Sequence, residues 1–152
     1  MLKKALKFLK SNNRKKRRSR SPSKSVVWEK ANDVKIELSR LLELSSLPHK
    51  MENISSFRSY NSKAHAYARI WGLSKIWQLA LNEKPHYIIE VISEKYDNLP
   101  DGRKDEVLLH ELAHIPMNFS GSLLPHIRYG KRSFHRKVDS LIRSVKLNEK
   151  CK

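Results

Sequence analysis

The sequence VLLHELAHIP, residues 107–116, decides the fold and the chemistry expected of this chain. Its apolar positions follow helical spacing, so we predict a nearly buried helix over about residues 103–114. Pro116 ends this helix because its ring would clash with the carbonyl group of Leu112. His110 and His114 lie one turn apart on the same helix face, and both imidazoles can therefore reach a single zinc ion. Glu111, beside the first histidine, is expected to take a proton from a water molecule that zinc has acidified.

A catalytic zinc ion needs a third protein ligand and an open position for water. The compact pattern H-E-x-x-H-x-x-G-x-x-H is absent, because Met117 stands at its glycine position. A looser arrangement is present, since Gly121 lies seven residues after His114 and can reverse the chain, and His126 follows five residues later. The sequence therefore favours His126 as the third ligand and leaves three alternatives, which are His135, Asp139 and Glu149.

Three more residues are candidates for a role near this site. Asp139 could orient a ligand histidine through a hydrogen bond instead of binding the metal itself. Arg128 or Tyr129 could stabilise the oxyanion of a hydrolytic reaction, and a structural or surface role is the alternative for each. The spacing of the remaining histidines does not indicate a ligand.

The surrounding sequence predicts an α+β domain. Helical spacing from Trp28 to Leu42 predicts a first amphipathic helix that Pro48 stops, and alternation over residues 63–71 predicts a strand with alanines on one side. The β-branched run YIIEVI, residues 87–92, predicts a buried strand. A short helix over 73–81, with a second strand as the alternative, and a C-terminal amphipathic helix over 134–145 complete the predicted elements.

Most of the charge of this chain is at its N-terminal end. The 152 residues carry a formal net charge of +17, and residues 1–25 contain 11 Lys or Arg and no acidic residue, which leaves +6 on the rest. We therefore expect a disordered basic tail over 1–25, a folded domain over 26–147 and a short C-terminal tail over 148–152. Residues 3–24 are expected to bind DNA or RNA phosphates; anionic lipid, or no dedicated partner, is the alternative.

Composition excludes several classes of protein. The longest apolar runs are a few residues long, far short of the roughly 18 needed to cross a membrane, so we predict no transmembrane segment. The single cysteine, Cys151, excludes an intrachain disulfide or a multi-cysteine metal cluster and fits a reducing compartment. Lysines interrupt the apolar positions of residues 2–9, which argues against a secretory signal, although the composition overlaps with that of organellar transit peptides. We expect a cytoplasmic location.

Several segments together resemble one known family. They are YIIEVI at 87–92, KYDNL at 95–99, VLLHELAHIP at 107–116, FSG at 119–121 and PH at 125–126. Over roughly residues 28 to 145 the chain resembles the phage-type metallopeptidases, also found in archaea, which are zincin-like and related in plan to SprT-like proteases. The resemblance implies a zincin-like fold, His110, His114 and His126 as zinc ligands, and Glu111 as the catalytic base. Many members carry leucine where this chain has Ala113, a difference that leaves the ligands in place.

Two hypotheses about function follow. The first is a zinc-dependent peptidase that hydrolyses a peptide or protein substrate and is held near nucleic acid by its basic tail. In such a fold the edge strand of the sheet would pair with an extended peptide. The second is a nucleic-acid-binding protein in which zinc has a structural role only. The sequence indicates neither the substrate nor the oligomeric state.

Overall fold

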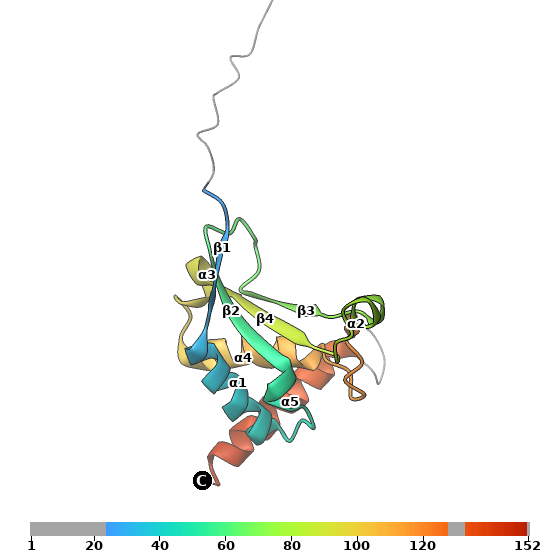
Figure 1. Ribbon diagram of the computed structural model, residues 1–152. Helices are drawn as coiled ribbons and strands as arrows, with labels where there is room; N and C mark the ends of the chain where they lie inside the picture. The colour runs from blue at the N-terminus through green and yellow to red at the C-terminus, as the bar shows by residue number, and fades with distance from the viewer. Residues whose placement is uncertain (1–23, 128–132, 152) are drawn as a thin grey trace, which may run out of the picture.

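A computed structural model describes residues 24–127 and 133–151 of the chain. Its elements follow one another in a mixed order of strands and helices (Figure 1). They are β1 (Val27–Lys30), α1 (Asn32–Ser45), the 3-10 turn η1 (Met51–Asn53), β2 (Ile54–Tyr60), β3 (Ala68–Gly72), α2 (Lys75–Leu81), β4 (Tyr87–Ile92), α3 (Ser93–Tyr96), α4 (Asp101–Ala113) and α5 (Phe134–Glu149). The fold class is α+β, as the sequence predicted.

The four strands form one mixed sheet in the order β1-β2-β4-β3. β4 runs parallel to β2 and antiparallel to β3, with Ile89 opposite Ile70 and Val91 opposite Ala68. Tyr87, Ile89 and Val91 of β4 are fully buried, which explains why the sequence of this strand is a β-branched apolar run. β3 lies at one edge of this sheet, and β1 lies at the other.

Helices α1, α4 and α5 lie together on one side of the sheet, below it in Figure 1. Their apolar faces meet the sheet in one core, which includes Leu38 and Leu41 of α1, Leu108 and Leu112 of α4, and Val138, Leu141 and Val145 of α5. Burial of the leucines of α4 fixes the rotation of this helix, so that His110 and His114 turn toward β3 and the segment after α4. No helix in residues 24–127 or 133–151 is long and apolar enough to cross a membrane.

The start of the domain differs from the sequence prediction. Residues 28–30, expected to begin the first helix, belong to strand β1 instead, because they pair with β2 and the indole of Trp28 donates a hydrogen bond to Glu90. The strand expected from residue 63 begins only at Ala68, and β2 was not predicted as a strand. The predicted helices over 73–81, 103–114 and 134–145 and the strand over 87–92 are present as α2, α4, α5 and β4.

Candidate metal centre

The structure brings His110, His114 and His126 together. One ring nitrogen of each residue lies within 4.8 Å of one from each of the others. His110 projects from α4, His114 is the C-cap residue directly after it, and His126 comes from the segment that follows. Among the described residues, this is the one group of histidine, cysteine or acidic side chains close enough to share a metal ion. His135, Asp139 and Glu149 are not part of it.

A pair of hydrogen bonds fixes the approach of the third histidine. The amide of Leu124 donates to the carbonyl oxygen of His114 at 2.8 Å, and Nδ1 of His114 donates to the carbonyl oxygen of Leu124 at 2.7 Å. The second bond places the proton of His114 on Nδ1, which leaves the lone pair of Nε2 free to bind a metal. Because Leu124 is held against α4, His126 two residues later reaches the same point.

The donor set fits zinc. Nε2 of His110 lies 3.0 Å from Nε2 of His126. Two nitrogens bound to one tetrahedral zinc ion at about 2.0–2.1 Å lie about 3.3–3.4 Å apart, so a shift of a few tenths of an ångström would suffice. Three imidazoles would leave the fourth position of a tetrahedral site open, and His126 is exposed. The three histidines therefore form a cluster that can hold a metal ion.

Phe134, the first residue of α5, forms an apolar wall against the three histidines. Its ring stacks on His114 with centroids 4.3 Å apart and meets His126 and His110 edge to face at 4.6 and 5.1 Å. From the sequence, Phe134 was expected only as a position on the apolar face of a helix. A contact between residues 114 and 134 depends on how α5 packs on α4, and local spacing carries no signal for it.

Burial shifts the ionisation of this group. Burial lowers the pKa of His110 to about 4, and the neighbouring histidines 114, 126 and 135 add to the effect. Burial is also the main cause that lowers the pKa of His114. These imidazoles are thus in the neutral form that binds metals. Burial of the Glu111 carboxyl group raises its pKa to about 7.

A cleft of about 620 Å³ joins the metal centre to the edge of the sheet. Its lining includes Ala66, Ala68 and Trp71 on one side and Glu111 and the three histidines on the other. A second cleft, of about 510 Å³, lies beyond Glu111 and is also bounded by Ala66 and Ala68. The small side chains that gave residues 63–71 their alternating pattern therefore face the candidate site.

The alternative ligands have other contacts. His135 lies 3.5 Å from Asp139, one turn along α5, and its side chain is 86% exposed. Glu149 accepts a hydrogen bond from Arg40 at 2.5 Å. Asp139 lines the second cleft, and within the described residues it does not contact the ring nitrogens of the cluster. Arg128 and Tyr129, the candidates for oxyanion stabilisation, lie outside the described residues.

The segment that carries His126 is anchored to the end of β3. Gly121 has a positive φ of 87°, as expected of a residue that reverses the chain, and its amide donates to the Tyr87 hydroxyl at 2.8 Å. The side-chain amide of Gln78 donates to the carbonyl oxygens of Leu73 and Ser120 at 2.7 and 2.8 Å. A Cβ atom on Gly72 would lie 2.4 Å from the carbonyl oxygen of Gly121. The supporting roles of Gln78 and Tyr87 were not predicted from the sequence.

Comparison with known proteins identifies the family. Residues 26–145 match the family described as "putative phage metallopeptidase". The chain belongs to this family. No curated protein and no solved structure gives a significant match. Membership of a metallopeptidase family implies a bound metal and a peptide or protein substrate, and His110, His114 and His126 form a cluster that can hold the metal.

Proposed function

We propose that this chain is a zincin-like, zinc-dependent peptidase. In this proposal His110, His114 and His126 hold zinc, and Glu111 is the catalytic base. The observation that carries the proposal is the convergence of three ring nitrogens beside a buried carboxyl group, at a cleft that runs along an edge strand.

The residues of the chain have separate tasks in hydrolysis. Zinc, when bound, supplies a Lewis acid that polarises the scissile carbonyl group and acidifies the attacking water. Glu111 accepts a proton from that water and passes it to the leaving amine. The Leu124 carbonyl oxygen holds the ring of His114 in one orientation through the 2.7 Å hydrogen bond to Nδ1. Phe134 limits the access of solvent to the histidines from the side of α5.

Strand β3 provides a way to bind the substrate. It lies at the edge of the four-stranded sheet, so its outer backbone groups can pair with an extended peptide. Ala66 and Ala68 border both clefts beside Glu111, and their small side chains leave room for a peptide backbone to approach. A peptide paired with this edge would present a carbonyl group to Glu111 and the histidines.

The competing hypothesis is a structural zinc ion in a nucleic-acid-binding protein. Structural zinc sites are closed by four protein ligands, usually with cysteine among them. Here the described cluster has three histidines, and His126 is exposed at the cleft. This arrangement favours catalysis.

Replacement of Glu111 by glutamine tests the proposal. Glu111→Gln keeps the size of the side chain and removes the base, so we expect one equivalent of zinc to remain while cleavage of fluorescein-labelled casein falls by about 10²–10⁴-fold. His126→Ala removes a ligand and is expected to lose both zinc and cleavage, whereas the matched control His135→Ala keeps both. Zinc is measured by elemental analysis of the purified protein, and circular dichroism checks the fold.

Two results would refute this proposal. Cleavage by Glu111→Gln at the wild-type rate would show that Glu111 is not the base. Loss of zinc from His135→Ala, with zinc retained by His126→Ala, would assign the third ligand to α5 instead.

We further propose that residues 3–24 bind nucleic acid and raise the local concentration of the peptidase near proteins bound there. The charge of this segment supports the proposal, because residues 1–25 contain 11 Lys or Arg and no acidic residue. Binding of the full chain to a fluorescein-labelled DNA duplex, followed by anisotropy at about 50–200 mM salt, tests it. Replacing residues 14–18 by glutamines should lower the salt slope by about 0.9 for each phosphate that the tail no longer neutralises. The control Arg143→Gln with Lys146→Gln, on the exposed side of α5, should leave the slope unchanged. Equal slopes for all chains would refute the tether.

A further inference from the structure

Helix α2 has its large apolar side chains in solvent, and its one buried side chain is the polar Gln78. Ile76, Trp77, Leu79 and Leu81 are each more than half exposed, at 70%, 59%, 67% and 56%, whereas Gln78 is 4% exposed. An amphipathic helix of a globular domain normally shows the opposite arrangement. Contiguous exposed apolar side chains of this kind mark a binding surface.

The position of α2 is fixed by hydrogen bonds. Gln78 donates to the carbonyl oxygens of Leu73 and Ser120, so the buried side of the helix is tied both to the end of β3 and to the segment that carries His126. The amide of Leu73 donates to the carbonyl oxygen of His86 at 2.8 Å. The apolar side chains of α2 are therefore presented on a rigid support.

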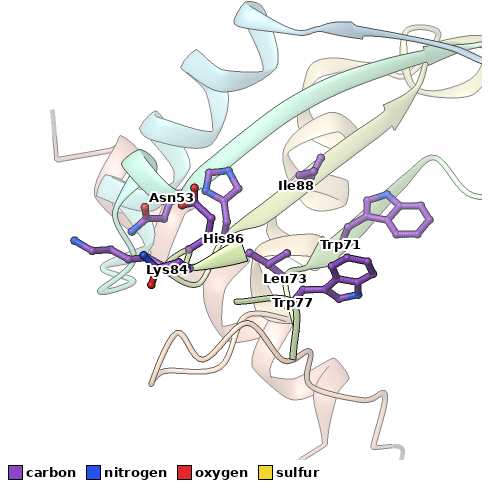
Figure 2. Close-up of a pocket in the computed structure, with 10 residues that line it drawn as sticks. Asn53, Trp71, Leu73, Trp77, Lys84, His86 and Ile88 are labelled. Carbon is purple, nitrogen blue, oxygen red and sulfur yellow. The ribbon is translucent and has the colours of Figure 1, made fainter. Parts of the chain in front are cut away.

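A pocket of about 750 Å³ lies between α2 and the sheet, and it is larger than either cleft beside Glu111. Figure 2 shows Trp71 and Trp77 together on one side of this pocket, with Leu73 and Ile88 in its middle and Lys84 and His86 at the opposite end. The pocket is thus aromatic on one side, apolar in its middle and polar at its far end. A pocket of this size and lining suits one or two bulky apolar side chains.

Trp71 connects this pocket to the metal centre. It lines the pocket beside α2 and also lines the cleft that contains Glu111 and the three histidines. Its indole nitrogen donates to the Glu90 carboxylate at 3.0 Å, which holds the ring in place. Both cavities therefore border β3 and share Trp71, whose register partner Ile88 lies on the face of the sheet opposite the core residues Tyr87 and Ile89.

The spacing along β3 defines what can bridge the two cavities. Ala68 borders the cleft beside Glu111, and Trp71 is three residues further along the strand. A strand rises about 3.3 Å per residue, so the pocket begins about 10 Å from the position level with Glu111. An extended peptide paired with β3 covers this distance in three to five residues.

We propose that the pocket lined by Trp71, Leu73, Trp77 and Ile88 is a second substrate site, which binds a bulky apolar side chain three to five residues from the scissile bond. This rests on the proposed peptidase function. The ligand is an extended polypeptide with leucine, phenylalanine or a similar residue at that distance. Continuity with the cleft favours the substrate over a separate partner, because one peptide on β3 reaches both cavities. The apolar middle of the pocket favours a polypeptide over a nucleic-acid backbone.

Peptide binding tests the pocket independently of catalysis. Two fluorescein-labelled twelve-residue peptides are compared by anisotropy with the full-length Glu111→Gln protein loaded with zinc. One contains Leu-Phe-Leu in a sequence of glycine and serine, and the other has serine at these three positions. Burial of the apolar side chains is expected to make the first peptide bind at least about tenfold more tightly.

Two substitutions in α2 form a matched pair. Trp77 and Leu79 are similarly exposed, but only Trp77 lines the pocket. We expect Trp77→Ser to remove most of the preference for the apolar peptide and Leu79→Ser to keep it. Cleavage sites mapped by mass spectrometry in a library of proteome-derived peptides should show apolar residues enriched at one offset of three to five residues. Trp77→Ser should lose that enrichment, and Leu79→Ser should keep it.

The outcomes separate this proposal from the proposed function. If the wild-type protein cleaves peptides but Trp77→Ser does not change its preference for apolar residues near the cleavage site, the proposed pocket is refuted and the peptidase function stands. If Trp77→Ser weakens binding of the apolar peptide but the wild-type protein cleaves nothing, the pocket is supported and the peptidase function is refuted. Binding of a fifteen-residue oligothymidine dependent on Trp77, or a dimer in analytical ultracentrifugation that Trp77→Ser abolishes, would overturn the proposal in favour of nucleic acid or a second copy of the chain.

Discussion

Helices α4 and α2 both border β3, and they depart from ordinary amphipathic patterning in opposite ways. α4 carries His110 and the buried Glu111 among leucines that are fully buried, and His114 caps its C-terminal end. α2 carries its apolar residues in solvent and buries only Gln78. Polar groups placed inside and apolar groups placed outside both lower stability, and proteins keep such features where function requires them.

Strand β3 borders two regions of different chemical character. On the side of α4, β3 borders a polar, partly buried centre suited to chemistry; at its far end, beside α2, it borders an apolar pocket suited to recognition. Gln78 and Gly121 join the two regions, because the segment that carries His126 packs against the end of β3. The two helices therefore differ in what they contribute to stability as well as in chemistry.

The same substitution in the two helices should give very different losses of stability. Leu108 of α4 is fully buried, whereas Leu79 of α2 is 67% exposed. Leu108→Ala removes core packing and leaves a cavity, so we expect a loss of about 2–5 kcal/mol in the free energy of unfolding. Leu79→Ala is expected to change it by less than about 0.5 kcal/mol. Urea denaturation at a fixed zinc concentration, followed by circular dichroism, measures both.

Similar losses in the two variants would contradict the comparison. A loss above about 1 kcal/mol for Leu79→Ala, beyond what an exposed side chain gives, would show that α2 is covered by another surface in solution. In that case the variant should also change the sedimentation coefficient of the protein, which supplies a direct check.

The sequence predicted the parts of the fold with a strong local pattern. The periodic leucines of α4, the β-branched run of β4 and the amphipathic spacing of α5 each led to an element of the correct type. β2 was missed because three of its seven residues are serines and its pattern of burial is irregular. Residues 28–30 were predicted as helix from the spacing of Trp28 and Ala31, whereas their pairing with β2 and the bond from Trp28 to Glu90 are long-range contacts that local spacing does not indicate.

The candidate site also has parts that local spacing predicts and parts that depend on long-range contacts. Adjacent turns of one helix bring His110 and His114 together, so their spacing was sufficient to predict a pair. His126 was favoured from chain reversal at Gly121, but its position depends on the bonds between Leu124 and His114. Phe134 and the supporting bonds of Gln78 join segments that are far apart in the sequence, and no local pattern indicates them.

Glu90 of β4 links the edge strands of the sheet. Its carboxylate accepts hydrogen bonds from the indole of Trp28 on β1 at 3.1 Å and from Arg69 and Trp71 on β3 at 2.9 and 3.0 Å. Burial opposes ionisation of this group, but hydrogen bonds from its neighbours outweigh that effect and lower the pKa of Glu90 below its ordinary value. Through Trp71, this carboxylate holds the residue shared by the cleft of α4 and the pocket of α2.

Glu90→Gln should give a smaller loss of stability than Leu108→Ala, and one that depends on pH. A carboxyl group whose pKa is lowered by folding stabilises the protein fully above its unfolded pKa of about 4.3, and this contribution is lost as the pH falls through the folded value. We expect the variant to be about 1–2 kcal/mol less stable than the wild-type protein at pH 7, because a neutral amide replaces an acceptor of three hydrogen bonds. The difference should shrink as the pH falls below about 4 towards the lowered pKa of the folded protein, because below that pKa Glu90 is protonated in both the folded and the unfolded chain. Other carboxylates, such as the Asp33 group that bonds Arg58, titrate equally in both proteins and cancel in the difference.

Urea denaturation of the two proteins from pH 7 to pH 3 measures this difference in the free energy of unfolding. A difference that stays constant with pH would show that packing of the Glu90 side chain, and not its charge, positions Trp71 beside the two cavities.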